Sequence, residues 1–178
     1  MVKKLVKLVF TLILTAVVFM HFLNMILPLK YVSFISTACE KYNVDKALVF
    51  SIVKAESGFN EKAHSNKGAK GLMQLTDETA SWCAEKMGLN DFDIYDPETN
   101  INIGVWYISY LSEKTNSKDL TIISYNAGIN KVNSWIDEGL VGREIKNENN
   151  IPYPETKKYL QKVRIYEKLY ELRLKYNF

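Results

Sequence analysis

The feature that most constrains this chain is a long apolar run close to its N-terminus. Leu8 to Leu27 is a stretch of 20 residues without an ionised side chain. Wound into an α-helix, it would extend about 30 Å, the thickness of the hydrocarbon core of a bilayer. His21 and Asn24 interrupt the run only near its far end, where an interface tolerates polar groups. The run therefore predicts a helix that spans a lipid bilayer.

The charges around the run predict its orientation. Residues 1–30 hold four lysines and no acidic residue, and three of these lysines precede the run. Lysines next to an apolar segment stay in the cytoplasm, so the rest of the chain is expected on the outer side. Residues 31–178 are left with 19 basic and 20 acidic side chains. That balance lacks the basic footprint of a nucleic-acid-binding protein, and no nucleic-acid partner is expected.

A cleaved signal peptide is the competing interpretation of the apolar run. The run is longer than a usual signal core, and no small-x-small site follows it closely. Ser36–Cys39 resembles a lipoprotein cleavage box, but it lacks the expected leucine and lies beyond Pro28 and Lys30. We therefore expect an uncleaved anchor. Residues 1–30 would form a basic tip, the anchor and a short tether, and residues 31–178 would form one folded domain.

The spacing of apolar residues and helix caps predicts an all-α fold for this domain. Asp96 with Pro97 starts one helix, and no alternating strand pattern or internal repeat is evident. Polar, irregular connections are expected over residues 58–70 and 138–150. The other expected helices cover Tyr31–Tyr42, Asp45–Ser57, Asp77–Met87, Leu120–Tyr125, Val132–Ile136 and Pro154–Tyr176.

The helix over Asp45–Ser57 places a carboxylate in an unusual position. Asp45 is a good N-cap, Gly58 is a typical residue just past a helix end, and apolar residues cover most of the circumference between them. Glu56 therefore lies in the last turn of a helix that should be largely buried. Burial and the negative end of the helix dipole both raise its pKa, which would let it act as a general acid. The alternative is an exposed glutamate beside a helix end.

Five motifs in order give the chain a family resemblance. They are Glu56-Ser57, Gly71-Leu-Met-Gln74, Asp96-Pro-Glu-Thr-Asn-Ile-Asn-Ile-Gly104, Ser124-Tyr-Asn-Ala-Gly128 and Ile151-Pro-Tyr-Pro-Glu-Thr-Lys-Lys-Tyr159. Together they resemble the signature of the soluble lytic transglycosylase family, whose catalytic domain is similar to goose-type lysozyme. The resemblance covers about residues 31–175. It implies a lysozyme-like helical domain that acts on peptidoglycan.

The resemblance also implies a reaction that needs only one carboxylate. Such an enzyme cleaves the β-1,4 bond between N-acetylmuramic acid and N-acetylglucosamine in glycan strands and leaves a 1,6-anhydro end. Glu56 would be the catalytic residue, first as acid and then as base. Two alternatives stay open, namely a hydrolytic lysozyme and a non-catalytic glycan-binding or scaffold protein. In either catalytic case the implied location is the outer face of a bacterial cytoplasmic membrane, with one pass through Leu8–Leu27.

Further site residues follow from the matched motifs. The resemblance implies that Ser65 bonds a substrate N-acetyl group, that the Tyr125 hydroxyl approaches Glu56, and that Glu155 helps organise the cleft. Glu155 is equally a favourable acid in a first helical turn, and Tyr125 equally a core tyrosine. The implied substrate-binding set is Ser65, Met73, Gln74, Tyr125, Asn126 and Glu155. Met73 has a core alternative, and the segment from Asn126 has a turn alternative.

Three motif residues are expected to shape the backbone rather than touch substrate. The Ser57 hydroxyl is placed to bond a carbonyl near the helix end, and Gly71 and Gly128 are expected to supply backbone freedom.

The two cysteines and the scarce histidines suggest no further chemistry. Cys39 and Cys83 could pair after export, but each lies in a helical pattern, where a buried free thiol is the commoner state. His64 stands alone in its segment, and the chain has no Cys-x-x-Cys pair. Neither a metal ion nor another cofactor is expected.

Overall fold

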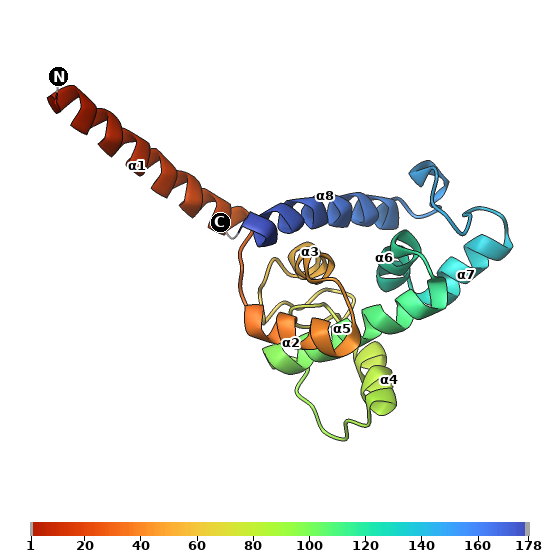
Figure 1. Ribbon diagram of the computed structural model, residues 1–178. Helices are drawn as coiled ribbons and strands as arrows, with labels where there is room; N and C mark the ends of the chain where they lie inside the picture. The colour runs from red at the N-terminus through yellow and green to blue at the C-terminus, as the bar shows by residue number, and fades with distance from the viewer. Residues whose placement is uncertain (1, 177–178) are drawn as a thin grey trace.

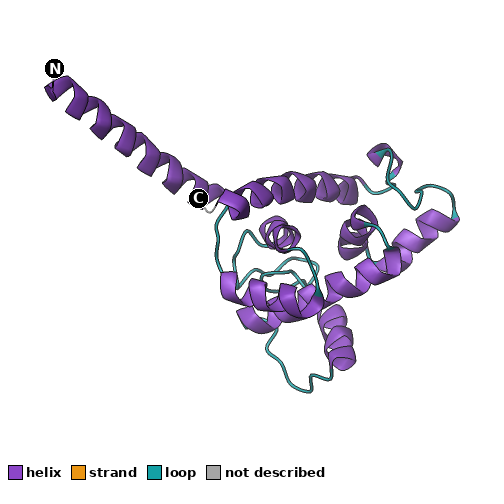
Figure 2. Ribbon diagram, in the orientation of Figure 1, coloured by secondary structure: helices purple, strands orange, loops and turns teal. Residues whose placement is uncertain are grey.

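The computed structural model describes residues 2–176 and is helical, without a named β-strand in that range (Figures 1 and 2). This confirms the predicted all-α class. Met1, Asn177 and Phe178 lie outside the described residues, so the outer ends of the predicted segments 1–30 and 31–178 do too. The helices are α1 Val2–Ile26, α2 Val32–Tyr42, α3 Lys46–Glu56, α4 Asp77–Met87, α5 Pro97–Thr115, α6 Lys118–Ala127, α7 Ile129–Asp137 and α8 Pro154–Tyr176, with a 3-10 turn at Glu148–Asn150.

Helix α3 lies at the centre of the domain, with α8 packed along it (Figure 1). Its first turn is capped by Asp45, whose carboxylate accepts a hydrogen bond from the Leu48 N–H at 3.0 Å. Most of its residues are buried, and the Phe50 ring stacks on Tyr170 of α8 with ring centres 5.3 Å apart. Past its end, Gly58 adopts a φ of +60°. The prediction of a largely buried helix is confirmed.

The remaining helices begin and end at the local signals that the sequence carries. Thr76 accepts a hydrogen bond from the Thr79 N–H at the start of α4, and Gly88 closes α4 with a φ of +73°. Asp96 caps α5 in the same way, with Pro97 in its first turn. Helices α6 and α7 are longer than predicted, because Ser117 and Gly128 lie at their starts rather than inside the loops.

The connection from α3 to α4 has no regular structure but is firmly held. The Ser57 hydroxyl lies 2.7 Å from the Leu72 carbonyl and 3.2 Å from that of Val53, so it ties the loop to the helix end. Gly71 has a φ of +75°, and a Cβ there would lie 2.8 Å from Cγ of the buried Asn100. Only glycine fits both that conformation and that space. At Gly128 only the backbone conformation favours glycine. Its φ is +85°, whereas a Cβ there would meet nothing within 4 Å.

Asn100 of α5 fastens the same loop from the opposite side. Its amide donates to the carbonyls of Ile94 at 2.8 Å and Lys70 at 3.2 Å, and its oxygen accepts from the Met73 N–H at 2.8 Å. A fully buried amide is costly unless its polar atoms are bonded, and here all of these bonds go to backbone. The loop that carries Gly71–Gln74 is therefore positioned by buried contacts and not by its own secondary structure.

Helix α1 projects away from the domain, and its side chains are not covered by it (Figure 1). By length and composition it is long and apolar enough to cross a membrane. The connection after α1 is held to α8, since the Tyr170 hydroxyl donates to the Pro28 carbonyl at 3.2 Å. Arg173 also donates to the Leu23 carbonyl at 2.9 Å and bonds Asn24. The sequence predicted only a short tether at this point.

Candidate active site

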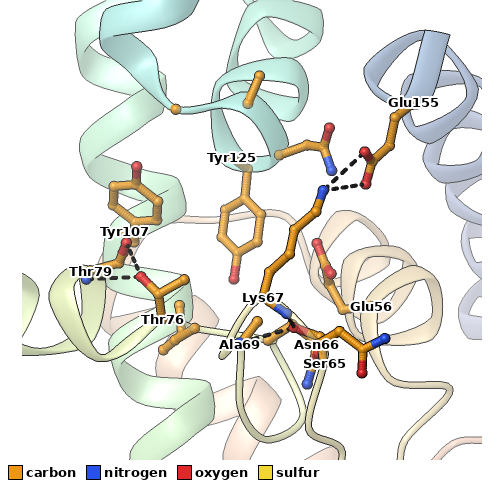
Figure 3. Close-up of a pocket in the computed structure, with 15 residues that line it drawn as sticks. Glu56, Ser65, Asn66, Lys67, Ala69, Thr76, Thr79, Tyr107, Tyr125 and Glu155 are labelled. Carbon is orange, nitrogen blue, oxygen red and sulfur yellow. Dashed lines mark hydrogen bonds and ion pairs between the residues drawn. The ribbon is translucent and has the colours of Figure 1, made fainter. Parts of the chain in front are cut away.

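An open cleft of about 510 Å³ lies where the end of α3, the loop before α4 and the start of α8 meet. Helix α5 and the junction of α6 and α7 complete its walls. Figure 3 shows Glu56 and Tyr125 projecting into it from different helices. The predicted site residues that line it are Glu56, Ser65, Gln74, Tyr125, Asn126, Gly128 and Glu155.

Glu56 is the last residue of α3, and its carboxyl faces the cleft. Its Oε1 accepts a hydrogen bond from the Tyr159 hydroxyl at 2.6 Å. Burial, the largest cause, raises the pKa of Glu56 from 4.5 to about 7, while the Tyr159 bond and the charge of Lys162 act in the opposite direction. The carboxyl is therefore protonated up to about neutral pH and can donate a proton.

Lys162 of α8 also secures the end of α3, because its ammonium donates to the Ala55 carbonyl at 2.8 Å. A cation at this point satisfies one of the free carbonyls at the helix end and suits the negative end of the helix dipole. Lys162 therefore holds α8 to α3 next to the carboxyl whose pKa it lowers.

Two tyrosines lie near Glu56, since the charge of Glu56 helps burial to raise the pKa of Tyr125, but the hydrogen bond comes from Tyr159. The Tyr125 hydroxyl donates to the Met73 carbonyl at 2.8 Å, whereas Tyr159 donates to Glu56. Tyr125 does line the cleft, but its hydroxyl holds the Gly71–Gln74 loop against α6. Tyr159 was not among the candidate residues, although it ends the last motif and lies one helical turn after Glu155. That i, i+4 relation on α8 was a usable signal.

Met73 is a correction to the expected substrate-binding set. Its side chain is fully buried, and it is absent from the residues that line the cleft. A Cβ on Gly104 of α5 would collide with the Met73 side chain, so this glycine leaves the space that Met73 fills. The thioether is therefore a core group, the alternative that the sequence left open for it.

Gln74 and Ser65 line the cleft while also shaping the loop. The Gln74 amide nitrogen donates to the carbonyls of Gly71 at 3.0 Å and Ala63 at 3.2 Å, which leaves its oxygen as the free acceptor. The Ser65 hydroxyl oxygen accepts from the Ala69 N–H at 3.0 Å, which leaves its hydrogen to be donated. Gln74 can therefore accept a hydrogen bond from a bound molecule, and Ser65 can donate one.

Asn126 lies at the junction of α6 and α7 and is aligned from α8. Its oxygen accepts a hydrogen bond from the Thr156 hydroxyl at 2.8 Å, and Thr156 is buried in the first turn of α8. This bond leaves the amide hydrogens of Asn126 as donors on the cleft wall. Asn126 and Ala127 end α6, so the turn alternative holds only for Gly128, which follows Ala127 with a φ of +85°.

An exposed ion pair crosses the rim of the cleft. The Lys67 ammonium lies 3.1 Å from Oε2 of Glu155, and the two side chains are 80% and 72% exposed. In Figure 3 Lys67 reaches from the loop toward Glu155 past Glu56. Glu155 thus occupies both of its expected positions, the cleft and the first turn of α8, and its charge contributes to raising the pKa of Glu56. Lys67 was not predicted from sequence, because it belongs to no motif.

The two cysteines and the acidic residues add no further site. Cys39 and Cys83 are both buried and free, and burial raises the pKa of each thiol to about 12. Within residues 2–176 there is no group of three His, Cys, Asp or Glu side chains that could hold a metal ion.

Known proteins are similar to this chain in sequence and in fold. The transglycosylase SLT domain family matches residues 33–147. The soluble lytic murein transglycosylase of Escherichia coli K12 is 30% identical over 150 residues, which are 80% of this chain and 23% of that protein. A membrane-bound lytic murein transglycosylase E from Buchnera aphidicola is 44% identical over 87 residues, 45% of this chain and 38% of that protein.

Solved structures of lytic transglycosylases share the fold of this chain. The 70 kDa soluble lytic transglycosylase of Escherichia coli superposes with a TM-score of 0.77 at 29% identity, over 83% of this chain and 25% of that one. A complex of the 70 kDa soluble lytic transglycosylase with bulgecin A superposes equally well. The chain spans about a quarter of the length of these soluble enzymes. With a family match over residues 33–147 and a shared fold, this chain belongs to the transglycosylase SLT domain family.

Proposed function

We propose that this protein is a membrane-anchored lytic transglycosylase that cleaves the β-1,4 bond between N-acetylmuramic acid and N-acetylglucosamine in peptidoglycan glycan strands. The observation that carries the proposal is the Glu56 carboxyl, which faces an open cleft and has its pKa raised to about 7 by burial. A carboxyl that is still protonated near neutral pH is what proton donation to a glycosidic oxygen requires. The names of the relatives support the same reaction class.

In the first step Glu56 acts as the acid. Its proton passes to the oxygen that links the two sugars, the bond from that oxygen to C1 of the muramic residue breaks, and N-acetylglucosamine leaves with a new hydroxyl. Positive charge develops at C1 and its ring oxygen. Glu56 becomes a carboxylate, and the Tyr159 hydroxyl at 2.6 Å stabilises that charge.

In the second step the same carboxylate acts as the base. Glu56 removes the proton from the C6 hydroxyl of the muramic residue, and that oxygen forms the new bond to C1. The product is a 1,6-anhydro sugar, no water is consumed, and Glu56 is again protonated. One carboxyl suffices for both steps. The other glutamate of the cleft, Glu155, is paired with Lys67 at the rim, where it orders the entrance.

The polar groups along the cleft suit an N-acetylated glycan. Asn126 and Ser65 offer hydrogens for acetyl oxygens, and the Gln74 oxygen accepts from a hydroxyl or amide. Met73 would contribute by supporting the loop from the core and not by contact with the sugar. Tyr125 would add an aromatic face to the wall.

We further propose that α1 anchors the enzyme by a single pass through the bacterial cytoplasmic membrane, with the domain on the outer face. The support is its length, its exposed apolar surface and the lysines at its start. The name of a membrane-bound relative supports attachment to a membrane. No protein partner is implied by these observations.

Product analysis tests the proposal. Purified peptidoglycan is digested with the full chain, and the released muropeptides are weighed by mass spectrometry. Anhydro products, lighter by one water than hydrolysed ones, are expected. Reducing ends in their place would indicate a hydrolytic lysozyme. The absence of any product, shared with the Glu56→Gln variant, would indicate a glycan-binding or scaffold protein.

A further inference from the structure

The outer face of α8, turned away from the domain, carries an apolar stripe. Ile165, Leu169 and Leu172 follow one another at helical spacing and are 60%, 38% and 50% exposed. The opposite face of the same helix holds buried residues such as Val163 and Tyr170, which pack on the core. A helix that covers a core normally presents charged residues on its outer side, so an aliphatic stripe there needs an explanation.

The stripe is accompanied by basic side chains. Three exposed lysines, Lys158, Lys168 and Lys175, lie on the same side of α8 as the stripe. None of them forms an ion pair within the described part of the chain. Two of the three acids of the helix are engaged elsewhere, and the third, Glu171, is exposed about 200° around the helix from Leu169. Glu167 is buried and binds Lys118 at 2.8 Å, and Glu155 pairs with Lys67 at the far end. An apolar stripe beside lysines is the pattern of a helix that lies in a membrane interface.

The C-terminal half of α8 is also fastened to the end of the candidate membrane helix. The buried guanidinium of Arg173 donates to the Leu23 carbonyl at 2.9 Å and bonds the Asn24 side chain. The Leu23 carbonyl accepts this bond in addition to one from the Leu27 N–H, and a cation at the last turn of α1 suits the negative end of the helix dipole. The Tyr170 bond to the Pro28 carbonyl adds a second connection.

These connections place the stripe next to where α1 would leave the bilayer. Leu172 directly precedes Arg173, and Leu169 lies about one turn before Leu172 in α8. Figure 1 shows α8 running away from the end of α1, with α3 and α6 on one side of it only. Lipid headgroups are therefore within reach of the stripe without the arrival of a second molecule. A protein partner or a second copy of the chain would need its own complementary surface, for which the lysines give no argument.

We propose that the outer face of α8 docks on the anionic lipid surface of the membrane that α1 enters. The aliphatic stripe lies at the boundary of headgroups and acyl chains, and the lysines contact lipid phosphates. This inference rests on the proposed role of α1 as an anchor. The cleft borders the first turn of α8, about 27 Å of helix from Arg173. Docking thus holds the cleft beside the membrane in one orientation, where a free tether would let it swing.

The test uses the full chain in nanodiscs of phosphatidylglycerol or of phosphatidylcholine. A polarity-sensitive fluorophore is attached at Leu169→Cys, and quenching by the neutral solute acrylamide is measured. The matched control carries the fluorophore at Glu171→Cys, an exposed position two residues on and about 200° around the helix. Cys39 and Cys83 are buried, so the unsubstituted chain should take up little label. We expect quenching at Leu169 to be about threefold weaker than at Glu171 in phosphatidylglycerol, and the difference to shrink in phosphatidylcholine.

A charge variant probes the role of the lysines. Lys168→Glu with Lys175→Glu, added to the Leu169 label, should restore strong quenching in phosphatidylglycerol. The control with the same change in net charge, Lys86→Glu with Lys131→Glu on exposed parts of α4 and α7, should leave the shielding in place. Restored quenching in both variants would overturn the local contact, because net charge alone would then explain it.

The remaining outcomes separate the docking from the anchor. Resistance of the full chain to carbonate extraction, combined with equal quenching at Leu169 and Glu171, overturns the docking and leaves the anchor standing. Shielding of Leu169 that persists in detergent overturns it in favour of a protein contact. Release of the chain by carbonate contradicts the anchor and the docking together, while product analysis still reports separately on the reaction.

Discussion

Two glutamates line the cleft in different environments, Glu56 at its floor and Glu155 at its rim. Glu56 on the floor is half-buried and bonded to Tyr159, and burial raises its pKa to about 7. Glu155 at the rim is largely exposed and paired with the equally exposed Lys67. Desolvation acts where water is excluded, and at the floor it keeps the Glu56 carboxyl protonated up to about neutral pH. A screened ion pair can order the entrance but contributes little free energy.

The floor is held by more contacts to the rest of the domain than the rim is. On the floor, α3 is secured by Lys162 of α8 and by the Ser57 hydroxyl, and Tyr125 fixes the loop that faces it. At the rim, Lys67 belongs to an irregular loop, and its only ion pair within residues 2–176 is with Glu155. We therefore expect substitutions on the floor to alter chemistry and substitutions at the rim to alter binding. The following predictions can break or sharpen that contrast.

The largest effect is expected from Glu56→Gln. The amide keeps the volume of the side chain but cannot transfer a proton, so cleavage of peptidoglycan should fall by more than ~10²-fold. Circular dichroism should show an unchanged fold. The matched control at the rim is Glu155→Gln, which should retain most of the turnover. Near-normal cleavage by the Glu56 variant would place the acid elsewhere and end the contrast.

The next effect concerns Tyr159→Phe. Its hydroxyl binds Glu56 and lowers the pKa of that carboxyl, so its loss should raise the pKa further and weaken the carboxylate state between the two steps. A hydrogen bond to a charged group contributes roughly 1.5–3 kcal/mol, which corresponds to a rate loss of about 10- to 100-fold. Tyr125→Phe is the control, since its hydroxyl binds the Met73 carbonyl and its loss should mainly reduce stability.

The dependence of kcat/KM on pH reports the pKa of Glu56 directly. Because Glu56 must be protonated to act as the acid, kcat/KM should fall as the pH rises through about 7 in the wild-type protein. In Tyr159→Phe the midpoint should move to higher pH, and in Tyr125→Phe it should stay near its wild-type value. A rate that already declines between pH ~4 and ~5 would indicate an ordinary glutamate and a floor that is not desolvated.

A smaller effect is expected on stability. The pKa of Glu56 is raised from 4.5 to about 7 on folding, so the native state holds its proton more tightly than the unfolded chain. The contribution of Glu56 to the free energy of unfolding should thus be fully present below pH ~4.5 and be lost as the pH rises through about 7. Glu56→Gln removes this loss and should stabilise the protein by up to about 3 kcal/mol at pH 8, with almost no effect at pH 4. Urea unfolding at the two pH values measures it, and equal effects at both would contradict a buried titrating group.

The smallest effect is expected at the rim. Lys67→Met removes an ion pair between two exposed side chains, and the free energy of unfolding should change by less than about 1 kcal/mol. Any change in activity should appear in KM and should fade with added salt, since the pair is screened by water and ions. A fall in kcat as large as that of the Tyr159 variant would show that the rim takes part in the chemistry.

Local signals explain how much of the fold could be predicted. The caps at Asp45 and Thr76, the stop at Gly88 and the proline that begins α8 gave bounds of α3, α4 and α8 that agree with the structure to within a residue or two. Each signal acts through a hydrogen bond or a backbone conformation within a few residues. Helices α6 and α7 were predicted too short, because the residues that begin them also suit turns.

The site was harder to predict because its contacts join distant segments. The bond from Tyr159 to Glu56 links residues 103 positions apart, and the bond from Arg173 to Leu23 links residues 150 apart. The motifs placed Tyr125 near Glu56, but the direction of its hydroxyl depends on the path of the Gly71–Gln74 loop. The burial of Met73 depends in turn on Gly104 of another helix. No local pattern carries that information.

The sequence by itself determined the helical class, the apolar N-terminal segment and the position of Glu56 at the end of a buried helix, because caps and periodicity act over a few residues. Only the tertiary structure decided that Tyr159 binds that carboxyl and that α8 is fastened to α1. The physical reason is that desolvation and side-chain hydrogen bonds depend on which helices pack together. That packing is a property of the whole core and not of any one segment.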